Sequence, residues 1–104
     1  MSFMSGSWTF LTNHTRVLAC VTRRPETTLR EVADCVGITE RATHRIVCEL
    51  EAAGYLTRRR VGSHNAYEVH ADRPLRHPMD EGRTVGDLLE ALDVQPDNTV
   101  QETV

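Results

Sequence analysis

Residues 28–56 read TLREVADCVGITERATHRIVCELEAAGYL and contain the clearest structural pattern in the chain. Apolar residues spaced three and four apart predict one helix over residues 29–36 and a second over residues 40–53. Gly37 separates them, and glycine readily adopts the positive φ at which a helix can end in a sharp turn. Thr39 is placed to cap the second helix, and Gly54 to end it. Two short helices joined by a glycine-containing turn are typical of a helix-turn-helix.

The flanking residues extend this motif on both sides. An apolar stripe predicts an earlier helix that begins near Thr12 and stops before Pro25, because proline disfavours helical angles in the residue before it. After the motif, alternating residues predict a strand over 55–61, a turn over 62–65 and a returning strand over 66–70. The predicted fold is α+β but mainly α: a winged helix-turn-helix with a three-helix core, a β-hairpin wing and a C-terminal amphipathic helix.

The C-terminal helix is predicted from Thr84, a plausible cap, to about Leu92. Its apolar stripe could fold back on its own domain beside Trp8 and Phe10. We favour packing against a second subunit, because a domain of 104 residues gains most from sharing its core. The residues assigned to dimerisation are Trp8, Phe10, Val85, Leu88, Leu89 and Leu92.

The chain is expected to divide into four parts. These are a flexible leader (1–7), the winged helix-turn-helix (8–70), a connector with the C-terminal helix for dimerisation (71–93) and a flexible acidic tail (94–104). The net charge of −3 divides unevenly between them. Residues 1–70 hold nine arginines against seven acidic residues, whereas residues 71–104 hold three against eight. The basic part therefore contains the motif, as expected for a DNA-binding protein.

The second helix of the motif has an exposed face suited to DNA. On a helical wheel, Arg41, His44 and Arg45 lie opposite the apolar residues, in the N-terminal half of the helix. Such residues meet base edges in the major groove, where arginine can bond guanine O6 and N7 together. Thr28 and Thr39, at helix starts, could hold phosphates. Alternatively, the arginines only keep an exposed face hydrated.

The predicted wing carries the densest positive charge, Arg58-Arg59-Arg60. Strand alternation sends Arg58 and Arg60 to one face and Arg59 to the other. Together with Ser63, His64 and Asn65 at the predicted turn, they could contact the DNA backbone or the adjacent minor groove. The alternative is an edge strand kept soluble by charge.

Residues 37–45 (GITERATHR) and 50–56 (LEAAGYL) resemble the winged helix-turn-helix of bacterial MarR- and ArsR-type transcriptional regulators, over about residues 9–70. The resemblance implies a homodimer that binds a short, two-fold symmetric operator in double-stranded DNA. It also implies that the helix matching residues 39–53 reads the bases and that the wing contacts the backbone.

The three cysteines leave a metal or thiol sensor open as an alternative. His44 and Cys48 lie one helical turn apart, but two ligands do not complete a site, and no Cys-x-x-Cys occurs. An odd number of cysteines does not favour a disulfide framework, and Cys20 and Cys35 are expected to be small core residues. No metal or cofactor is therefore assigned, although Cys48 could still be a redox-sensitive thiol.

Other functional classes receive little support from the sequence. No phosphate-binding glycine loop, His-Glu-x-x-His or Gly-x-Ser-x-Gly motif occurs, so an enzyme is not expected. The N-terminal residues lack a signal-peptide pattern, and no apolar run approaches the ~20 residues needed to span a bilayer. A cytoplasmic protein without membrane contact is expected. A winged helix that binds a protein partner instead of DNA is the remaining alternative.

Overall fold

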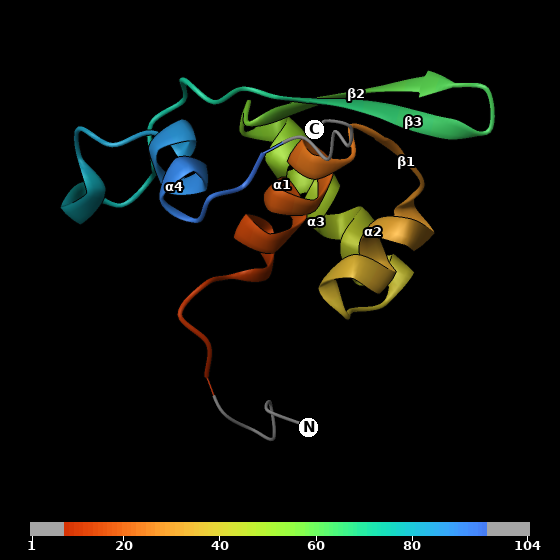
Figure 1. The fold of residues 1–104 in the computed structure, drawn as a ribbon, viewed down its shortest axis with the longest axis horizontal. Coiled ribbons are helices and arrows are strands. Elements are labelled where there is room, and N and C mark those ends of the chain that lie inside the picture. The colour runs from red at the N-terminus through yellow and green to blue at the C-terminus, as the bar shows by residue number, and fades with distance from the viewer. Residues whose placement is uncertain (1–7, 96–104) are drawn as a thin grey trace, which may run out of the picture.

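The structure is a computed structural model that describes residues 8–95. The predicted leader (1–7) and most of the predicted acidic tail (94–104) lie outside the described residues. In chain order, the elements are α1 (Asn13–Arg23), β1 (Glu26–Thr27), α2 (Leu29–Val36), α3 (Glu40–Ala52), β2 (Leu56–Val61), β3 (His64–Val69), the short 3-10 helix η1 (Pro78–Asp80) and α4 (Val85–Ala91). Helices α1, α2 and α3 lie against one another below the sheet (Figure 1). No helix in the described part of the chain is long and apolar enough to cross a membrane.

Threonine side chains set where the four α-helices begin. The hydroxyls of Thr12, Thr28, Thr39 and Thr84 each accept a hydrogen bond from a backbone N–H in the first turn of the helix that follows. These bonds satisfy donors that the helix itself cannot. The caps predicted at Thr39 and Thr84 are confirmed, and Thr12 and Thr28 cap α1 and α2.

The turn between α2 and α3 depends on Gly37. Its φ of +88° lies in the left-handed region, and both its N–H and that of Ile38 donate to the carbonyl of Ala33. Helix α2 therefore ends in a compact hydrogen-bonded turn, as glycine permits. Thr39 follows as the cap of α3, so the predicted helix-turn-helix is confirmed.

Three antiparallel strands form the sheet, in the order β1-β3-β2. The hairpin of β2 and β3 pairs Leu56 with Val69 at one end and Val61 with His64 at the other, so the turn is only Gly62-Ser63. The predicted four-residue turn over 62–65 was therefore too long. Strand β1 is not among the predicted elements; Glu26 pairs with Ala66 because the edge of β3 is open to it.

One core joins the four α-helices and the hairpin. Its fully buried side chains include Val17 of α1, Val32 of α2, and Ile46 and Val47 of α3. Leu56 and Tyr67 bring the sheet into the same cluster, and Val85, Leu89 and Val94 bring in the C-terminal segment. Val94, expected to begin the tail, is thus part of the folded domain. In Figure 1, α4 lies at the opposite end of the molecule from the hairpin turn.

Candidate nucleic-acid interface

Helix α3 has one buried and one exposed side. Thr43, Ile46, Val47 and Leu50 face the core, whereas Arg41, His44 and Arg45 are exposed. Thr43 is held further by its hydroxyl, which donates to the carbonyl of Thr39 at 2.8 Å. The division predicted from the helical wheel therefore exists in the structure, and it leaves two arginines and a histidine together on the N-terminal half of the helix.

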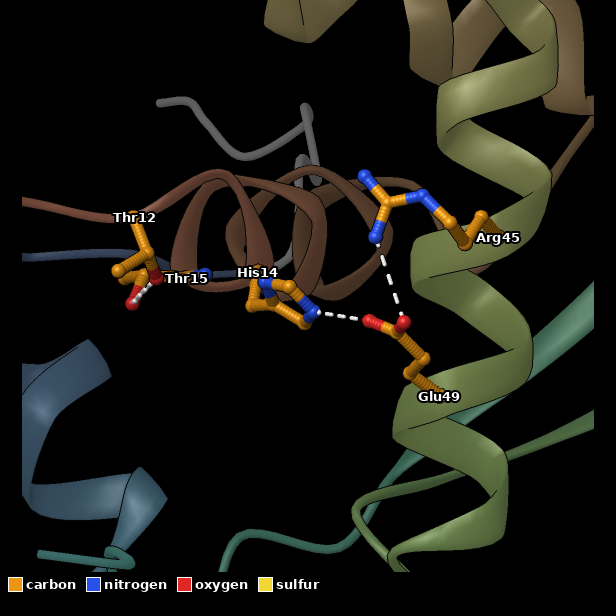
Figure 2. Close-up of polar contacts among 5 residues, drawn as sticks. All are labelled: Thr12, His14, Thr15, Arg45 and Glu49. Atoms are coloured by element: carbon orange, nitrogen blue, oxygen red, sulfur yellow. Dashed lines mark hydrogen bonds and ion pairs between the residues drawn. The ribbon is translucent and has the colours of Figure 1, made fainter.

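Arg45 has a charged partner on the exposed side of α3. Its Nη1 donates to Oε2 of Glu49 at 3.3 Å, one helical turn further along α3. The other carboxylate oxygen, Oε1, lies 2.7 Å from Nε2 of His14 on α1 (Figure 2). The hydrogen bond with His14 is the main cause that lowers the pKa of Glu49 from its ordinary value. Burial opposes it to a smaller extent, and the nearby charge of Arg45 lowers the pKa further. Glu49 is therefore a carboxylate near neutral pH.

Sequence reasoning did not single out Glu49 or His14. The Arg45–Glu49 pair has the (i, i+4) spacing at which opposite charges meet on a helix, so it could have been recognised in the sequence. His14 lies 35 residues away from Glu49. No sequence pattern links the two, because only the packing of α1 against α3 brings them together.

Thr28 and Thr39 act first as helix caps. The Thr28 hydroxyl accepts from the backbone N–H of Glu31, and the Glu31 carboxylate accepts from the N–H of Thr28 in return. The Thr39 hydroxyl accepts from the N–H of Ala42. Both threonines lie at helix starts, as predicted, and a hydroxyl that accepts there can still donate its hydrogen to a phosphate.

The three arginines of the wing have different surroundings. Arg58 is half-buried, and its Nη2 donates to the Glu51 carboxylate of α3 at 3.2 Å. Arg60 is exposed, and its Nε donates to the carbonyl of Gly62 at 2.9 Å. Arg59 is also exposed, and strand alternation places its side chain on the face of β2 opposite that of Arg58 and Arg60. Arg58 thus links the wing to α3 through its ion pair, whereas the side chains of Arg59 and Arg60 are exposed to solvent.

The turn at the end of the wing contains fewer residues than predicted. Ser63 lies in the turn and is exposed, but His64 and Asn65 belong to β3 and are partly buried. The Nε2 of His64 lies 3.4 Å from a Glu26 carboxylate oxygen without a hydrogen bond, and Asn65 Nδ2 donates to the Tyr67 hydroxyl at 3.2 Å. The predicted placement of His64 and Asn65 in the turn was therefore wrong, because the strand pairing continues through both.

The cysteines also differ from expectation. Cys20 of α1 and Cys35 of α2 form a disulfide, with Cα atoms 6.7 Å apart. Cys35 is exposed and is not a core residue, whereas Cys20 is half-buried and packs against the core. Cys48 is free, and its sulfur lies 3.7 Å from Nε2 of His44. Within residues 8–95, no group of three or more histidine, cysteine or acidic side chains could hold a metal.

The residues assigned to dimerisation fall into two sets. Val85 and Leu89 are buried in the chain's own core, so the stripe of α4 is covered at its centre by its own domain. Trp8 and Phe10 are 73% and 89% exposed, and their rings meet edge to face at 4.8 Å. Leu88 is half-buried and Leu92 is 37% exposed. Phe10 and Leu88 also line an open groove of about 870 Å³ between α1, α3 and α4.

Comparison with known proteins agrees with this geometry. The model of the MarR family matches residues 9–64, more than half of the chain. Among solved structures, the chain is similar to a MarR family transcriptional regulator from Silicibacter pomeroyi DSS-3, with 23% identity and a TM-score of 0.47. That alignment covers 54% of this chain and 40% of the other, so the chain spans less than half of that regulator. No curated protein matches. With its winged helix fold and this family match, the chain belongs to the MarR family of transcription regulators.

Proposed function

We propose that the protein is a sequence-specific DNA-binding regulator of transcription that reads its operator with α3. The observation that carries this proposal is the exposed N-terminal half of α3, where Arg41, His44 and Arg45 lie together. A helix presented in this way fits the major groove, and arginine forms paired hydrogen bonds with guanine there. The core residues on the opposite side of α3 hold this face outward.

The wing would contact the DNA backbone beside the bases that α3 reads. Arg59, Arg60 and Ser63 are exposed near the end of the hairpin. Arginine binds phosphates without regard to sequence, so these contacts would raise affinity for all DNA alike. Thr28 and Thr39 would add contacts where helix starts present backbone N–H groups to phosphates.

We further propose that the regulator acts as a homodimer on a two-fold symmetric operator, in the bacterial cytoplasm. Trp8 and Phe10 support this because large aromatic side chains so exposed need a cover, and aromatic residues are enriched in interfaces. Leu88 and Leu92 are the part of the α4 stripe that remains accessible for the same contact. A two-fold dimer would place its recognition helices about 34 Å apart, one turn of DNA.

Selection of bound duplexes from a random DNA pool tests this proposal. The expected result is enrichment of one motif, with two inverted half-sites about 10 base pairs apart. A single half-site would support sequence reading by α3 and contradict the dimer. No enrichment even at low salt, together with a protein partner that co-purifies in fixed ratio, would contradict DNA binding and favour a protein-interaction module.

A further inference from the structure

We propose that Glu49 determines sequence specificity by positioning Arg45. In this proposal, the Glu49 carboxylate is held by His14 and orients the Arg45 guanidinium toward one base pair. The inference rests on the proposed DNA-binding function and deepens it, because it names a residue that controls which base α3 reads. Glu49 itself would touch no base.

The geometry joins three side chains from two helices. The Thr12 hydroxyl caps α1 by accepting from the backbone N–H of Thr15, so the helix begins at Asn13, directly before His14. His14 from α1 and Arg45 from α3 both point toward Glu49, each to a different carboxylate oxygen (Figure 2). A carboxylate held at both oxygens has little freedom to rotate. Glu49 is thus a fixed acceptor beside the exposed face of α3.

Fixing one nitrogen of Arg45 leaves the rest of its donors available. Glu49 takes a hydrogen bond from Nη1, and within residues 8–95 no other side chain bonds to the Arg45 guanidinium. The edge formed by Nε–H and Nη2–H presents two parallel donors, the arrangement that matches O6 and N7 of guanine. Because the guanidinium is planar, holding Nη1 also restricts the orientations that this edge can take.

An ordinary surface ion pair would be the simplest explanation of Arg45 and Glu49. The two side chains are 63% and 50% exposed, and such pairs contribute little to stability. A carboxylate at the edge of a DNA-reading face also repels phosphates and lowers affinity for any DNA. The bond from His14, on a different helix, indicates that the carboxylate is held in place in spite of this cost.

An arginine without this support can bond to several bases or to phosphate. Ordering its long side chain on binding costs conformational entropy, whatever the sequence bound. If Glu49 orders Arg45 before binding, that cost is smaller for the one geometry in which guanine is read. Loss of Glu49 would therefore reduce discrimination between base pairs more than it reduces affinity for DNA in general.

The test is competition binding by the full chain, on the duplex selected from the random pool and on its single-base variants. The base pair read by Arg45 is the one at which Arg45→Ala loses its preference. At that base pair, Glu49→Gln is expected to lower the preference about fivefold or more. Affinity for an unrelated duplex should stay the same or rise, because a negative charge is removed.

Matched variants separate positioning from a structural role. Glu51→Gln makes the same charge change on α3 and also removes an arginine partner, Arg58, but should leave the base preference intact. His14→Gln keeps a donor near Glu49 and should retain the preference, whereas His14→Leu should lower it. In an Arg45→Ala background, Glu49→Gln should change the preference no further.

The outcomes distinguish this inference from the function on which it rests. If the wild-type chain selects a motif and both Glu49→Gln and His14→Leu, folded by circular dichroism, keep its base preference, Glu49 has no positioning role. An effect of Glu49→Gln that persists in the Arg45→Ala background would overturn the inference in the same way. If the wild-type chain selects no sequence, the proposed function fails, and the inference fails with it.

Discussion

Cys20 on α1 and Cys35 on α2 are joined by a disulfide that closes a loop of 15 residues and links α1 to the first helix of the helix-turn-helix. Cross-linking a loop of this length is expected to stabilise a domain by about 3 kcal/mol, because it restricts the unfolded chain. Reduction should therefore lower the free energy of unfolding by about this amount, measured by urea denaturation with and without a reductant. The Cys20→Ser/Cys35→Ser variant should have the same free energy of unfolding as the reduced wild type, and the reductant should not change it. Equal stability of both wild-type forms would contradict the prediction.

The capping box of α2, formed by Thr28 and Glu31, should make the free energy of unfolding depend on pH. The Thr27 hydroxyl, and then the Thr28 N–H, lower the pKa of Glu31 from its ordinary value of 4.5. A carboxyl group whose pKa is lower in the folded state stabilises the fold above its unfolded pKa, and this contribution is lost as pH falls through the folded pKa. Glu31→Gln should thus be less stable than wild type at pH 7, and the difference should shrink below pH 4.5. Urea denaturation at several pH values measures it; a difference that does not change with pH would refute this.

Gly37 should tolerate substitution poorly, for reasons of backbone angle alone. A Cβ at this position would meet no atom within 4 Å, but its φ of +88° is unfavourable for residues with a side chain. Gly37→Ala should lower the free energy of unfolding by about 1–2 kcal/mol. Gly37→Asn should lose less, since asparagine adopts this conformation more readily. Equal losses from both substitutions would show that something other than φ controls the turn.

The arginines of the wing should contribute unequally to DNA binding. Arg59 is exposed, whereas Arg58 is half-buried against Glu51. Arg59→Ala should weaken binding to all sequences alike and reduce the slope of log affinity against log salt by about one unit. Arg58→Ala should leave the salt slope nearly unchanged and lower stability instead. Fluorescence anisotropy over a salt series, combined with urea denaturation, measures both effects. The reverse pattern would mean that the Arg58–Glu51 pair opens on DNA.

Features determined by neighbouring residues could be predicted from the sequence. Thr28 and Thr39 cap helices and Gly37 ends one because each acts on backbone within a few residues of itself. The exposed face of α3 followed from the helical period in the same way. The placement of Arg41 and Arg45 on that face therefore needed no knowledge of tertiary structure.

Features that depend on packing could not be predicted. Strand β1 has two residues and exists only because Glu26 meets the open edge of β3. The disulfide requires α1 and α2 to pack with Cys20 facing Cys35, and the contact of His14 with Glu49 requires α1 to cross α3. The stripe of α4 was visible in the sequence, but whether its own domain or a second subunit covers Val85 and Leu89 was not.

The proposal that α3 reads DNA depends on Arg41 and Arg45 most of all. Binding of the wild type, Arg41→Ala and Arg45→Ala should be measured over a salt series, on the selected duplex and on an unrelated one. Each substitution is expected to lower the preference for the selected duplex by about tenfold or more, with a smaller effect on the unrelated one. If both variants keep the wild-type preference, α3 does not read the operator through this face.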